Sequence, residues 1–540
     1  MQHARAHSIV PQSVPHSRSH EGRFGRLFGR GFTTWEPPGP GDLEKQVAIH
    51  DFAVNEMFTD DEPPDSATPV GYTYFGQFVD HDITFDPQSS LTRHNDPDGL
   101  QSFRSPRLDL DSLYGRGPDD QPYLYDQQRT LHDGFAGFLR IGRGQATSFV
   151  EPDLQRNADG VAVIGDPRND ENVIVSQLQL AFIQLHNAIL QKLADAPSGA
   201  TTPGRKLFLE AQRITVWSYQ YVVWNDFVSR ITDPAIFAKA IAFDEDGGDG
   251  TGPRYSISYG FEDVYDWSEN PFIPVEFSVA AYRFGHSMIR AGYQLNFPLQ
   301  GGVGLRFGKP IFVAPPVPAA HAVTAGPADL RGGRALPEKH TLQWDWYFDF
   351  ASSVRGGPTP FPQRAHKIDT HLSRSVFNIP AGPGASNPLA ELNIKRGWRM
   401  ELPPATEVAT ALHIEPLAIE HPMEESLWVY ILKEAQVQHD GERLGAVGST
   451  LVAAVFSGLL RGDPFSYLNR APHWSPGKEL IDGQPVFPDK VSDVRAADRG
   501  EPVSPVWELI DLLHAAGVPE DVAGLNLIFA PQEAVVTVDD

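Results

Sequence analysis

The segment GQFVDHDITFDP, residues 76–87, is the most informative part of this chain. We predict a helix over residues 72–83, in which Gln77, Asp80 and His81 stand at positions i, i+3 and i+4 and share one face. A lone histidine on an amphipathic helix is usually structural or lies at the surface. Three polar groups on one face of a helix that also carries aromatic side chains are harder to explain in that way, and they favour a polar cavity beside the helix.

Further helices are predicted outward from this segment by apolar residues that recur every three or four positions. The clearest follows Asn172, where the spacings are four, three, four and four: Leu178, Phe182, Leu185, Ile189 and Leu193. The other predicted helices span residues 206–230, 276–290, 426–438, 446–460 and 505–516. Because alternating strand patterns are few, the sequence favours a mainly α fold, a large single helical domain with few short strands.

Acidic residues outnumber basic ones by 69 to 44, so the formal net charge is −25. This excess disfavours a nucleic-acid partner, because neutralising phosphates requires clustered Lys and Arg. The chain has no cysteine, which excludes disulfides, thiolate nucleophiles, iron–sulfur clusters and thiolate zinc sites. The absence of cysteine fits a reducing cytoplasm and equally a protein that tolerates oxidants.

Residues 1–40 are rich in Arg, His, Ser, Pro and Gly, a composition that predicts a flexible N-terminal arm. We expect residues 41–540 to form one large domain. The N-terminus lacks the apolar core of a secretory signal, and no stretch approaches the roughly 20 apolar residues of a membrane span. We therefore expect a cytoplasmic protein without a membrane span; non-classical secretion and the oligomeric state stay open.

The segment GDPRNDEN, residues 165–172, lies directly before the long helix and holds Arg168 and Glu171. Taken alone, it is explained by helix capping, with Asn169 or Asp170 as the N-cap and Glu171 placed favourably against the helix dipole. A functional role for Arg168 therefore needs support from other segments.

The segment EFSVAAYRFGHSMIR, residues 276–290, begins just after Pro274, where a helix is expected to start. Arg283 and His286 stand at i and i+3 on an otherwise apolar helix. Gly285 beside the histidine permits the close approach of something flat or bulky. The alternative is a buried, hydrogen-bonded histidine of the core.

The segment SPRLDLDSLYG, residues 105–115, places polar groups at alternate positions of an extended loop: Ser105, Arg107, Asp109 and Asp111. Alternate oxygens can wrap Ca²⁺, a hard cation that takes six to eight oxygen ligands. This is not an EF-hand, because leucine and tyrosine occupy positions where that loop needs an oxygen ligand and a glycine.

Two other polar segments are weaker signals. ELNIKRGW, residues 391–398, offers Asn393 and Arg396, or else it is an ordinary amphipathic turn. DEDGGDG, residues 244–250, is acidic but lacks the closing glutamate of an EF-hand, so we interpret it as a solvated turn.

Taken in order, these segments resemble those of the animal-type (myeloperoxidase-like) haem peroxidases of the peroxidase–cyclooxygenase superfamily, including its bacterial members. The resemblance spans about residues 70–465. It implies that residues 41–540 are a haem peroxidase catalytic domain with haem b as cofactor. The implied enzyme is an oxidoreductase that reduces hydrogen peroxide and oxidises small donors through a ferryl intermediate.

The resemblance also assigns roles to individual residues. His81 would be the acid–base catalyst above the iron, with Gln77 beside it and Arg168 as its partner. His286 would be the axial ligand of the iron, and Asn393 would accept the other ring N–H of that ligand.

Further residues would bind the haem covalently or through charge. Arg283 and Arg396 belong to the implied haem-binding set. Asp80 and Glu171 match the carboxylates that form ester bonds to haem methyls in the family. Asn172 stands where myeloperoxidase has a methionine, so a sulfonium link to a haem vinyl is excluded at that position.

The resemblance places a calcium site beside the distal helix. The matching positions are Asp82 and four positions of the following loop: Ser105, Arg107, Asp109 and Asp111. Because Asp82 directly follows His81, bound Ca²⁺ would fix the orientation of the helix that carries the histidine.

The residue types suit peroxide chemistry independently of the resemblance. Peroxide must lose a proton at its inner oxygen and gain one at its outer oxygen before the O–O bond breaks, and a neutral imidazole such as His81 can transfer that proton. Arg168 carries a permanent charge that can stabilise the departing oxygen. A ligand histidine that donates its other N–H to Asn393 keeps one tautomer.

Two alternatives stay open. Fatty-acid dioxygenases and cyclooxygenases of the superfamily use a radical tyrosine three residues before the proximal histidine; here that position is Arg283, and Tyr282 is one step out of register. A non-catalytic calcium-binding adhesion protein on this scaffold should lack at least one of the catalytic residues, yet all three are present: His81, Arg168 and His286.

The sequence does not fix the electron donor. Ester links raise the redox potential of the haem, and the missing sulfonium leaves it lower. We therefore expect bromide, iodide, thiocyanate or phenols to be oxidised before chloride.

Overall fold

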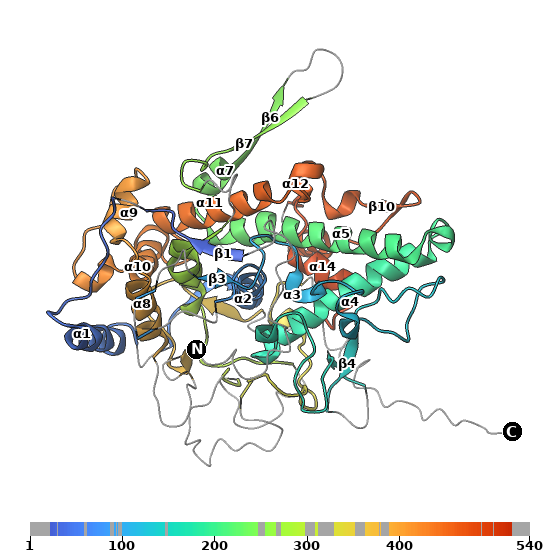
Figure 1. Ribbon diagram of the computed structural model, residues 1–540, viewed down its shortest axis with the longest axis horizontal. Helices are drawn as coiled ribbons and strands as arrows, with labels where there is room; N and C mark the ends of the chain where they lie inside the picture. Colours follow the sequence, from blue (N-terminus) through green and yellow to red (C-terminus); the bar gives the residue numbers. More distant parts are fainter. Residues whose placement is uncertain are drawn as a thin grey trace.

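Helices dominate the computed structural model of the protein (Figure 1). The strands of the described residues pair only in one three-stranded sheet and four two-stranded sheets, so the predicted mainly α fold is confirmed. The structure describes residues 22–29, 31–58, 62–86, 91–92, 94–95, 100–145, 150–246, 254–265, 272–296, 308–311, 329–350, 362–376, 379, 388–487, 489–499 and 502–520.

The bounds of the elements follow in chain order. The α-helices are α1 Asp42–Asn55, α2 Gly71–Ile83, α3 Asp111–Tyr114, α4 Val173–Asp195, α5 Gly204–Val222, α6 Ser229–Ile231, α7 Pro234–Ala240, α8 Leu389–Arg399, α9 Ala405–Ala411, α10 Leu427–His439, α11 Ala446–Gly462, α12 Tyr467–Arg470, α13 Val491–Arg499 and α14 Leu509–Ala515. The strands are β1 Gly22–Gly25, β2 Asp65–Pro69, β3 Gln101–Ser102, β4 Ile141–Arg143, β5 Pro152–Leu154, β6 Ile241–Asp246, β7 Arg254–Tyr259, β8 Ile273–Pro274, β9 Arg364–His366, β10 Leu480–Ile481 and β11 Gln484–Pro485.

Helix α2, which carries His81, confirms the helix predicted over residues 72–83 and packs against α4 and α5. Its apolar face carries Phe75 and Phe78, which are fully buried. The ring of Phe78 stacks on Phe182 of α4 with centroids 5.0 Å apart, and Tyr219 of α5 meets these rings edge-on. Such aromatic pairs contribute about 0.5–1.5 kcal/mol each beyond burial, so they hold the polar face of α2 in a fixed position.

The long helix predicted after Asn172 is confirmed as α4. Asn172 is its N-cap, because Oδ1 accepts hydrogen bonds from the backbone N–H groups two and three residues later. The predicted caps, Asn169 and Asp170, are wrong. They lie in a preceding 3₁₀ turn, Pro167–Asp170, which Asp166 caps.

The remaining predicted helices are confirmed with one exception. Residues 206–230 form α5, a π-helical turn Val223–Val228 and α6 without a break, and the three predictions nearest the C-terminus correspond to α10, α11 and α14. By length and composition α4 is apolar enough to cross a membrane, but 89% of its most apolar window is buried inside the protein, as is usual for a core helix.

The exception is the α-helix predicted over residues 276–290. The segment instead forms a π-helical turn, Glu276–Ala280, followed by a 3₁₀ helix, Ala281–His286. A local contact interrupts the helical pattern: Arg283 Nε donates to the Ser278 carbonyl at 2.9 Å, a carbonyl that a regular helix would use itself. Because a 3₁₀ helix has three residues per turn, positions i and i+3 still share one face.

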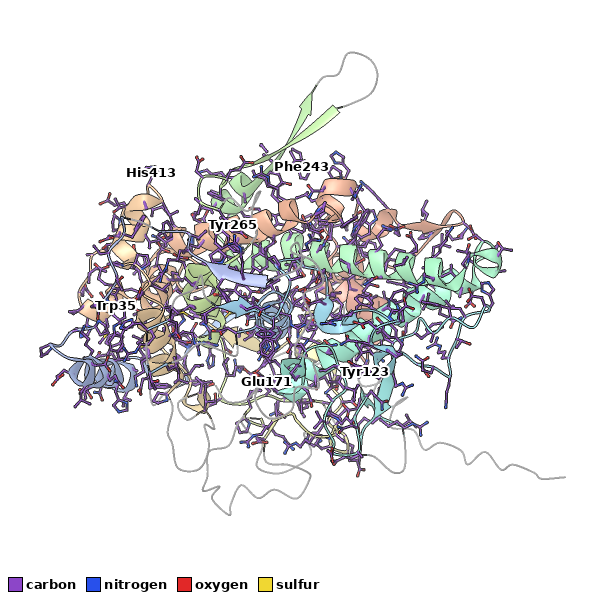
Figure 2. The ribbon with its side chains drawn as sticks, viewed as in Figure 1. Trp35, Tyr123, Glu171, Phe243, Tyr265 and His413 are labelled. Atoms are coloured by element: carbon purple, nitrogen blue, oxygen red, sulfur yellow. The ribbon has the colours of Figure 1, made fainter. Side chains whose placement is uncertain are left out.

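The flexible arm predicted for residues 1–40 is wrong over its second half. Strand β1 pairs with β3 and β8, and the buried carboxylate of Glu276 accepts hydrogen bonds from the backbone N–H groups of Leu27 and Phe28. Trp35 is only 5% exposed, and its backbone N–H donates to the Leu402 carbonyl (Figure 2). Residues 1–21 lie outside the described part of the chain.

The acidic run at residues 244–250 is not wholly a turn. Its first three residues belong to β6, which pairs with β7 in an antiparallel hairpin. The hairpin projects away from the helical body (Figure 1). Residues 247–250 lie outside the described residues.

Candidate active site

His81 lies near the C-terminal end of α2 and is 5% exposed. Its Nδ1 is 2.7 Å from Oδ1 of Asn169. Burial, reinforced by the positive charge of Arg168, lowers the pKa of His81 to about 3. The imidazole is therefore neutral at physiological pH and can accept a proton.

Arg168 is held beside His81 by three groups. Its Nη2 donates to the His81 carbonyl at 2.9 Å and to Asp166 Oδ2 at 2.7 Å, and the guanidinium lies 4.5 Å from the ring centroid of Phe85. Burial raises the pKa of Asp166, but Arg104 and Arg168 outweigh it and the net pKa is lowered, so this carboxylate stays charged. The predicted pairing with His81 thus runs through the backbone carbonyl of the histidine.

Gln77 connects α2 to the residues that precede α4. Its Nε2 donates to Glu171 Oε1 at 2.5 Å, and its Oε1 accepts from Asn172 Nδ2 at 3.2 Å. Burial raises the pKa of Glu171 to about 7, against the opposing effects of Arg168 and Gln77. Burial thus favours the protonated form of this glutamate more than in an exposed carboxyl.

Asp80 is the second carboxylate on this face of α2. Its Oδ1 accepts from Thr84 Oγ1 at 2.9 Å. Burial raises the pKa of Asp80, while the charges of Arg168 and Arg283 lower it. Helix α2 lies against the segment that ends in His286, because the Tyr282 hydroxyl donates to the Gly76 carbonyl at 3.2 Å.

His286 ends the 3₁₀ helix, and its Nδ1 is 2.8 Å from Nδ2 of Asn393 on α8. Burial, with the nearby charge of Arg283, lowers the pKa of His286 to about 3. In this arrangement the amide donates, whereas the sequence predicts that Asn393 accepts. A half-turn of the amide exchanges its nitrogen and oxygen, and metal binding through Nε2 requires that second orientation because the ring proton then sits on Nδ1.

Two arginines add positive charge beside His286. Arg283 donates through Nε to Ser278, and Arg396 lies 3.7 Å from Asp86. Burial, followed by repulsion from Arg283, lowers the pKa of Arg396 to about 10. Burial also lowers the pKa of Arg283, and the positive charge of the two arginines favours an anionic ligand.

The structure brings the predicted site residues together around one region. Several of them are only partly buried: Gln77, Asp80, Arg168, Glu171, Arg283 and His286. A Cβ added at Gly285, beside His286, would meet no atom within 4 Å, so there is open space next to this histidine.

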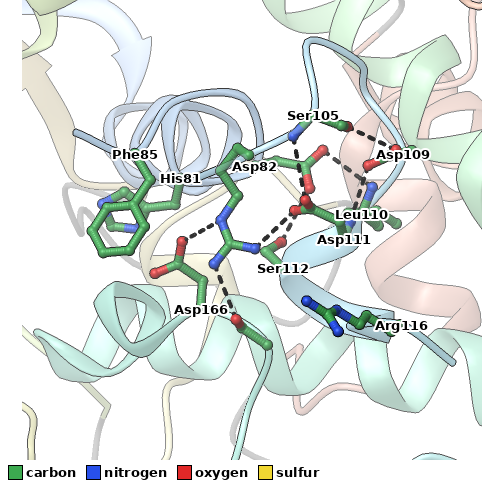
Figure 3. A network of polar contacts seen from close by, with 12 residues as sticks. His81, Asp82, Phe85, Ser105, Asp109, Leu110, Asp111, Ser112, Arg116 and Asp166 are labelled. Atoms are coloured by element: carbon green, nitrogen blue, oxygen red, sulfur yellow. Dashed lines mark hydrogen bonds and ion pairs between the residues drawn. The ribbon is translucent and has the colours of Figure 1, made fainter. Parts of the chain in front are cut away.

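Three carboxylates lie close together behind His81: Asp82, Asp109 and Asp111 (Figure 3). We call them the acidic cluster. One carboxylate oxygen from each lies within 4.8 Å of the others. Ser105 Oγ donates to Asp109 at 2.8 Å. Burial, followed by repulsion from the other two aspartates, raises the pKa of Asp82 well above its usual value, so the cluster favours a cation.

The loop of the acidic cluster differs in two ways from the prediction. It is not extended throughout, since Leu110 adopts a left-handed conformation with φ 55° and α3 begins at Asp111. The guanidinium of Arg107 turns to Asp463, 3.5 Å away, so only the main-chain carbonyl of Arg107 is left to ligate an ion.

Sequence reasoning missed four residues of this site. Arg104 and Asp166 form a buried ion pair beside the acidic cluster, and Asn169 and Gln179 are hydrogen-bonded to one another behind His81. Asp166 could have been found from its position two residues before Arg168. Gln179 gives no signal, because it sits in the middle of an apolar core helix.

Comparison with known proteins identifies the domain. A model of the animal haem peroxidase family matches residues 97–300. This part of the chain is similar to the animal haem peroxidases. The resemblance drawn from the sequence is thereby confirmed, and the family implies a haem cofactor. The matched range includes Arg168 and His286. His81 and Asn393 lie outside this range, but each is hydrogen-bonded to a residue within it, His81 to Asn169 and Asn393 to His286.

Two curated animal proteins are similar to this chain. A peroxidase-like protein of Margaritifera margaritifera is 29% identical over 271 residues, which cover 42% of this chain and 32% of the relative. Peroxidase mlt-7 of Caenorhabditis elegans is 25% identical, over 49% of this chain and 30% of the relative. The chain thus spans about a third of the length of these relatives.

Solved structures share the fold over nearly the whole chain. Peroxidase A from Dictyostelium discoideum aligns with a TM-score of 0.56 at 14% identity, covering 92% of this chain and 97% of that chain. A fatty acid alpha-dioxygenase of Oryza sativa, crystallised with palmitic acid, aligns with a TM-score of 0.54 at 14% identity over 95% of this chain and 82% of that chain. At this identity the likeness shows the fold alone.

Proposed function

We propose that this protein is a haem peroxidase that reduces hydrogen peroxide and oxidises small donors such as bromide, iodide, thiocyanate or phenols. The observation that carries the proposal is the pairing of two neutral histidines with different partners. His81 stands beside Arg168, and His286 stands beside Asn393. One histidine is thus equipped for proton transfer and the other for ligation.

The residues around His286 fit a haem. Its neutral imidazole is the form that ligates iron, and Gly285 leaves open space beside it. Arg283 and Arg396 supply the positive charge that the carboxylates of a haem require. Haem, when bound, supplies the two electrons that reduce the peroxide and recovers them from the donor.

The residues on the α2 side then handle the protons. His81 Nε2 takes the proton from the inner oxygen of hydrogen peroxide and returns it to the outer oxygen, which leaves as water. Arg168, fixed by Asp166 and Phe85, stabilises the negative charge that develops on that outer oxygen. Because these partners hold the guanidinium in place before peroxide arrives, no reorganisation is needed during the step.

The two carboxylates of this face, Asp80 and Glu171, are proposed to form ester bonds to haem methyls. Each is oriented by one neighbour, Thr84 for Asp80 and Gln77 for Glu171. Each ester would consume one hydrogen peroxide, which is reduced to two waters as the carboxylic acid and the methyl group each lose one hydrogen. Haem that resists extraction by acidified solvent, and is released in the Asp80→Asn, Glu171→Gln double variant, would support the esters.

The acidic cluster is proposed to bind Ca²⁺. Asp82, Asp109 and Asp111 supply carboxylate oxygens, and Ser105 can supply a hydroxyl; these are the hard oxygen ligands that Ca²⁺ prefers. The divalent charge would compensate carboxylates that Arg104 alone cannot neutralise.

The test is the absorption spectrum of the chain expressed with haem available. A Soret band that shifts with one equivalent of peroxide and returns on adding bromide or a phenol is expected. His81→Gln should slow the shift by about 10²–10⁴-fold, the contribution of a general acid–base group. His186→Gln is a matched control, since His186 is a buried histidine of α4 that is hydrogen-bonded to Tyr114 and Gly137. Failure to bind haem would overturn the proposal.

A fatty-acid dioxygenase is the second candidate, favoured only by the shared fold. Tyr282 is the nearest tyrosine to His286 along the segment, and its hydroxyl donates to the Gly76 carbonyl at 3.2 Å. Its ring stacks on Phe277. Arg283, not tyrosine, stands three residues before His286, which favours the peroxidase.

A further inference from the structure

Behind His81 a chain of side-chain amides runs into the protein. His81 Nδ1 contacts Asn169 Oδ1 at 2.7 Å, Asn169 Nδ2 donates to Gln179 Oε1 at 2.8 Å, and Gln179 Nε2 donates to the Ser112 carbonyl at 3.3 Å. Asn169 and Gln179 are fully buried. We refer to these two residues as the amide relay.

The direction of every hydrogen bond in the amide relay is set at its far end. A backbone carbonyl can only accept, so the Ser112 oxygen requires the NH₂ group of Gln179. Gln179 must then turn its oxygen to Asn169, and Asn169 must turn its own oxygen to His81. Nδ1 of His81 consequently carries the proton, and Nε2 keeps its lone pair.

The arrangement resists reversal because none of its members can reach water. If Asn169 alone turned over, its oxygen would meet the oxygen of Gln179, and its NH₂ would meet the N–H of His81. Buried groups left without partners in this way are costly. The far end is itself anchored, since Ser112 Oγ donates to Asp82 Oδ1 at 3.2 Å (Figure 3).

We propose that Asn169 and Gln179 are positioning residues of the peroxidase reaction, which hold His81 in the tautomer that presents the Nε2 lone pair to peroxide. The inference rests on the proposed function for its catalytic consequence, but the tautomer itself does not. Neither residue touches the reacting atoms. Their effect passes through His81, as a hydrogen-bond partner fixes the tautomer of a catalytic or ligand histidine elsewhere.

Gln179→Leu is the principal test, because it removes the anchor without touching His81. Asn169 becomes free to turn and present its NH₂ to Nδ1, which favours the tautomer with the proton on Nε2. We expect the bimolecular rate constant for the reaction with peroxide to fall by about 10- to 100-fold, part of the effect of losing a general base. The rate of the later reaction with bromide or a phenol should not change, since it does not use the lone pair.

Gln177→Leu is the matched control. Gln177 lies on the same helix, is also buried, donates to the His340 carbonyl at 3.0 Å and accepts from the Leu342 N–H at 2.8 Å. Its loss removes a pair of buried hydrogen bonds of the same kind, away from His81. Equal effects of Gln177→Leu and Gln179→Leu on the peroxide step would overturn the proposal.

A second pair of variants separates the effect of the acceptor at residue 169 from any effect of misfolding. Asn169→Asp keeps an acceptor facing Nδ1 and should retain the tautomer and most of the peroxide rate, whereas Asn169→Leu should lose both. If Asn169→Asp is as slow as Asn169→Leu while both remain folded, the acceptor at residue 169 does not matter and the proposal fails.

The tautomer is read directly by ¹⁵N NMR of the full chain labelled at histidine, with bound haem reduced and carbon monoxide added so that the iron is diamagnetic. Comparison with His81→Gln assigns the signals. A proton on Nδ1 in the wild type, lost in Gln179→Leu, supports the amide relay; a proton on Nε2 in the wild type overturns it. If the wild type does not react with peroxide, the proposed function fails while this measurement still decides the tautomer.

Discussion

Arg104 Nε lies 2.8 Å from Asp166 Oδ2, and both side chains are almost fully enclosed by protein. The same guanidinium donates through Nη1 to Asp111 Oδ1 at 3.1 Å, while Asp166 Oδ2 accepts a hydrogen bond from Arg168 Nη2 at 2.7 Å. One buried arginine therefore links the acidic cluster to the positive charge that stands beside His81.

Replacing this arginine should destabilise the protein strongly. Arg104→Met leaves the buried Asp166 with Arg168 as its remaining cation and removes the cation that contacts Asp111, a loss of about 3–5 kcal/mol in the free energy of unfolding. Urea unfolding measures it. Arg116→Met is the control, because Arg116 pairs with the exposed Asp120, and surface pairs contribute about 0–1 kcal/mol. Similar losses in the two variants would show that the buried pair is not important for stability.

The contact between Asn393 and His286 gives a second prediction. Asn393→Leu removes the partner of Nδ1, so the ring of the ligand histidine is less well oriented and less basic. We expect haem affinity or peroxidase activity to fall by about 10–100-fold, as is usual for such partners of ligand histidines. Haem titration of the purified variant measures the affinity. Asn393→Asp, which keeps an acceptor for the ring N–H, should bind haem better than Asn393→Leu; the reverse order would contradict the role of this residue.

Local patterns predicted the helices that hold the site. Helix α2 and the start of α4 at Asn172 follow from side-chain spacing and a capping residue, both of which act within one or two turns. The α-helix predicted over residues 276–290 was wrong because Arg283 Nε donates a hydrogen bond to the Ser278 carbonyl. The prediction of a flexible N-terminal arm was wrong because the polar composition gave no sign that Trp35 is buried or that two backbone N–H groups of the segment donate to Glu276. The contacts of Glu276 with the N-terminal segment join residues far apart in sequence, whereas the contact of Arg283 with Ser278 is local but competes with the hydrogen bonds of a regular helix.

The site itself was predicted unevenly for the same reason. His81, Arg168 and His286 stand in recognisable motifs. Asn169 lies next to Arg168 but was interpreted as a cap, since its contact with His81 spans 88 positions. Gln179 has no local feature that separates it from any polar residue on a core helix, so only the packing of α4 against α3 shows its role.

Removal of calcium provides a third prediction. A chelator should lower the melting temperature of the protein, because Asp82, Asp109 and Asp111 repel one another when no cation lies between them. The Soret band should also change, since the helix that carries His81 is anchored through Asp82. Calorimetry and absorption spectra with EGTA, and again after excess Ca²⁺, measure both effects. An unchanged melting temperature and spectrum would show that the acidic cluster holds no structural calcium.

The pH dependence of stability can be traced at Glu434, which lies outside the active site. Glu434 is fully buried on α10, and its carboxylate accepts hydrogen bonds from the N–H groups of Val447 and Gly448 at the start of α11. Burial raises its pKa to about 7, although these hydrogen bonds act in the opposite direction. Its ordinary pKa is about 4.3.

Glu434→Gln should therefore change the pH profile of unfolding. Between about pH 4 and pH 7 the unfolded chain releases the Glu434 proton while the folded protein retains it, so this group's contribution to stability is full below that window and is lost as pH rises, by roughly 1.4 kcal/mol per pH unit. The glutamine cannot ionise and avoids this loss. Urea unfolding at pH 5 and pH 8 should show the variant gaining stability relative to the wild type as pH rises. A difference that stays constant between the two pH values would mean that Glu434 does not titrate in this range.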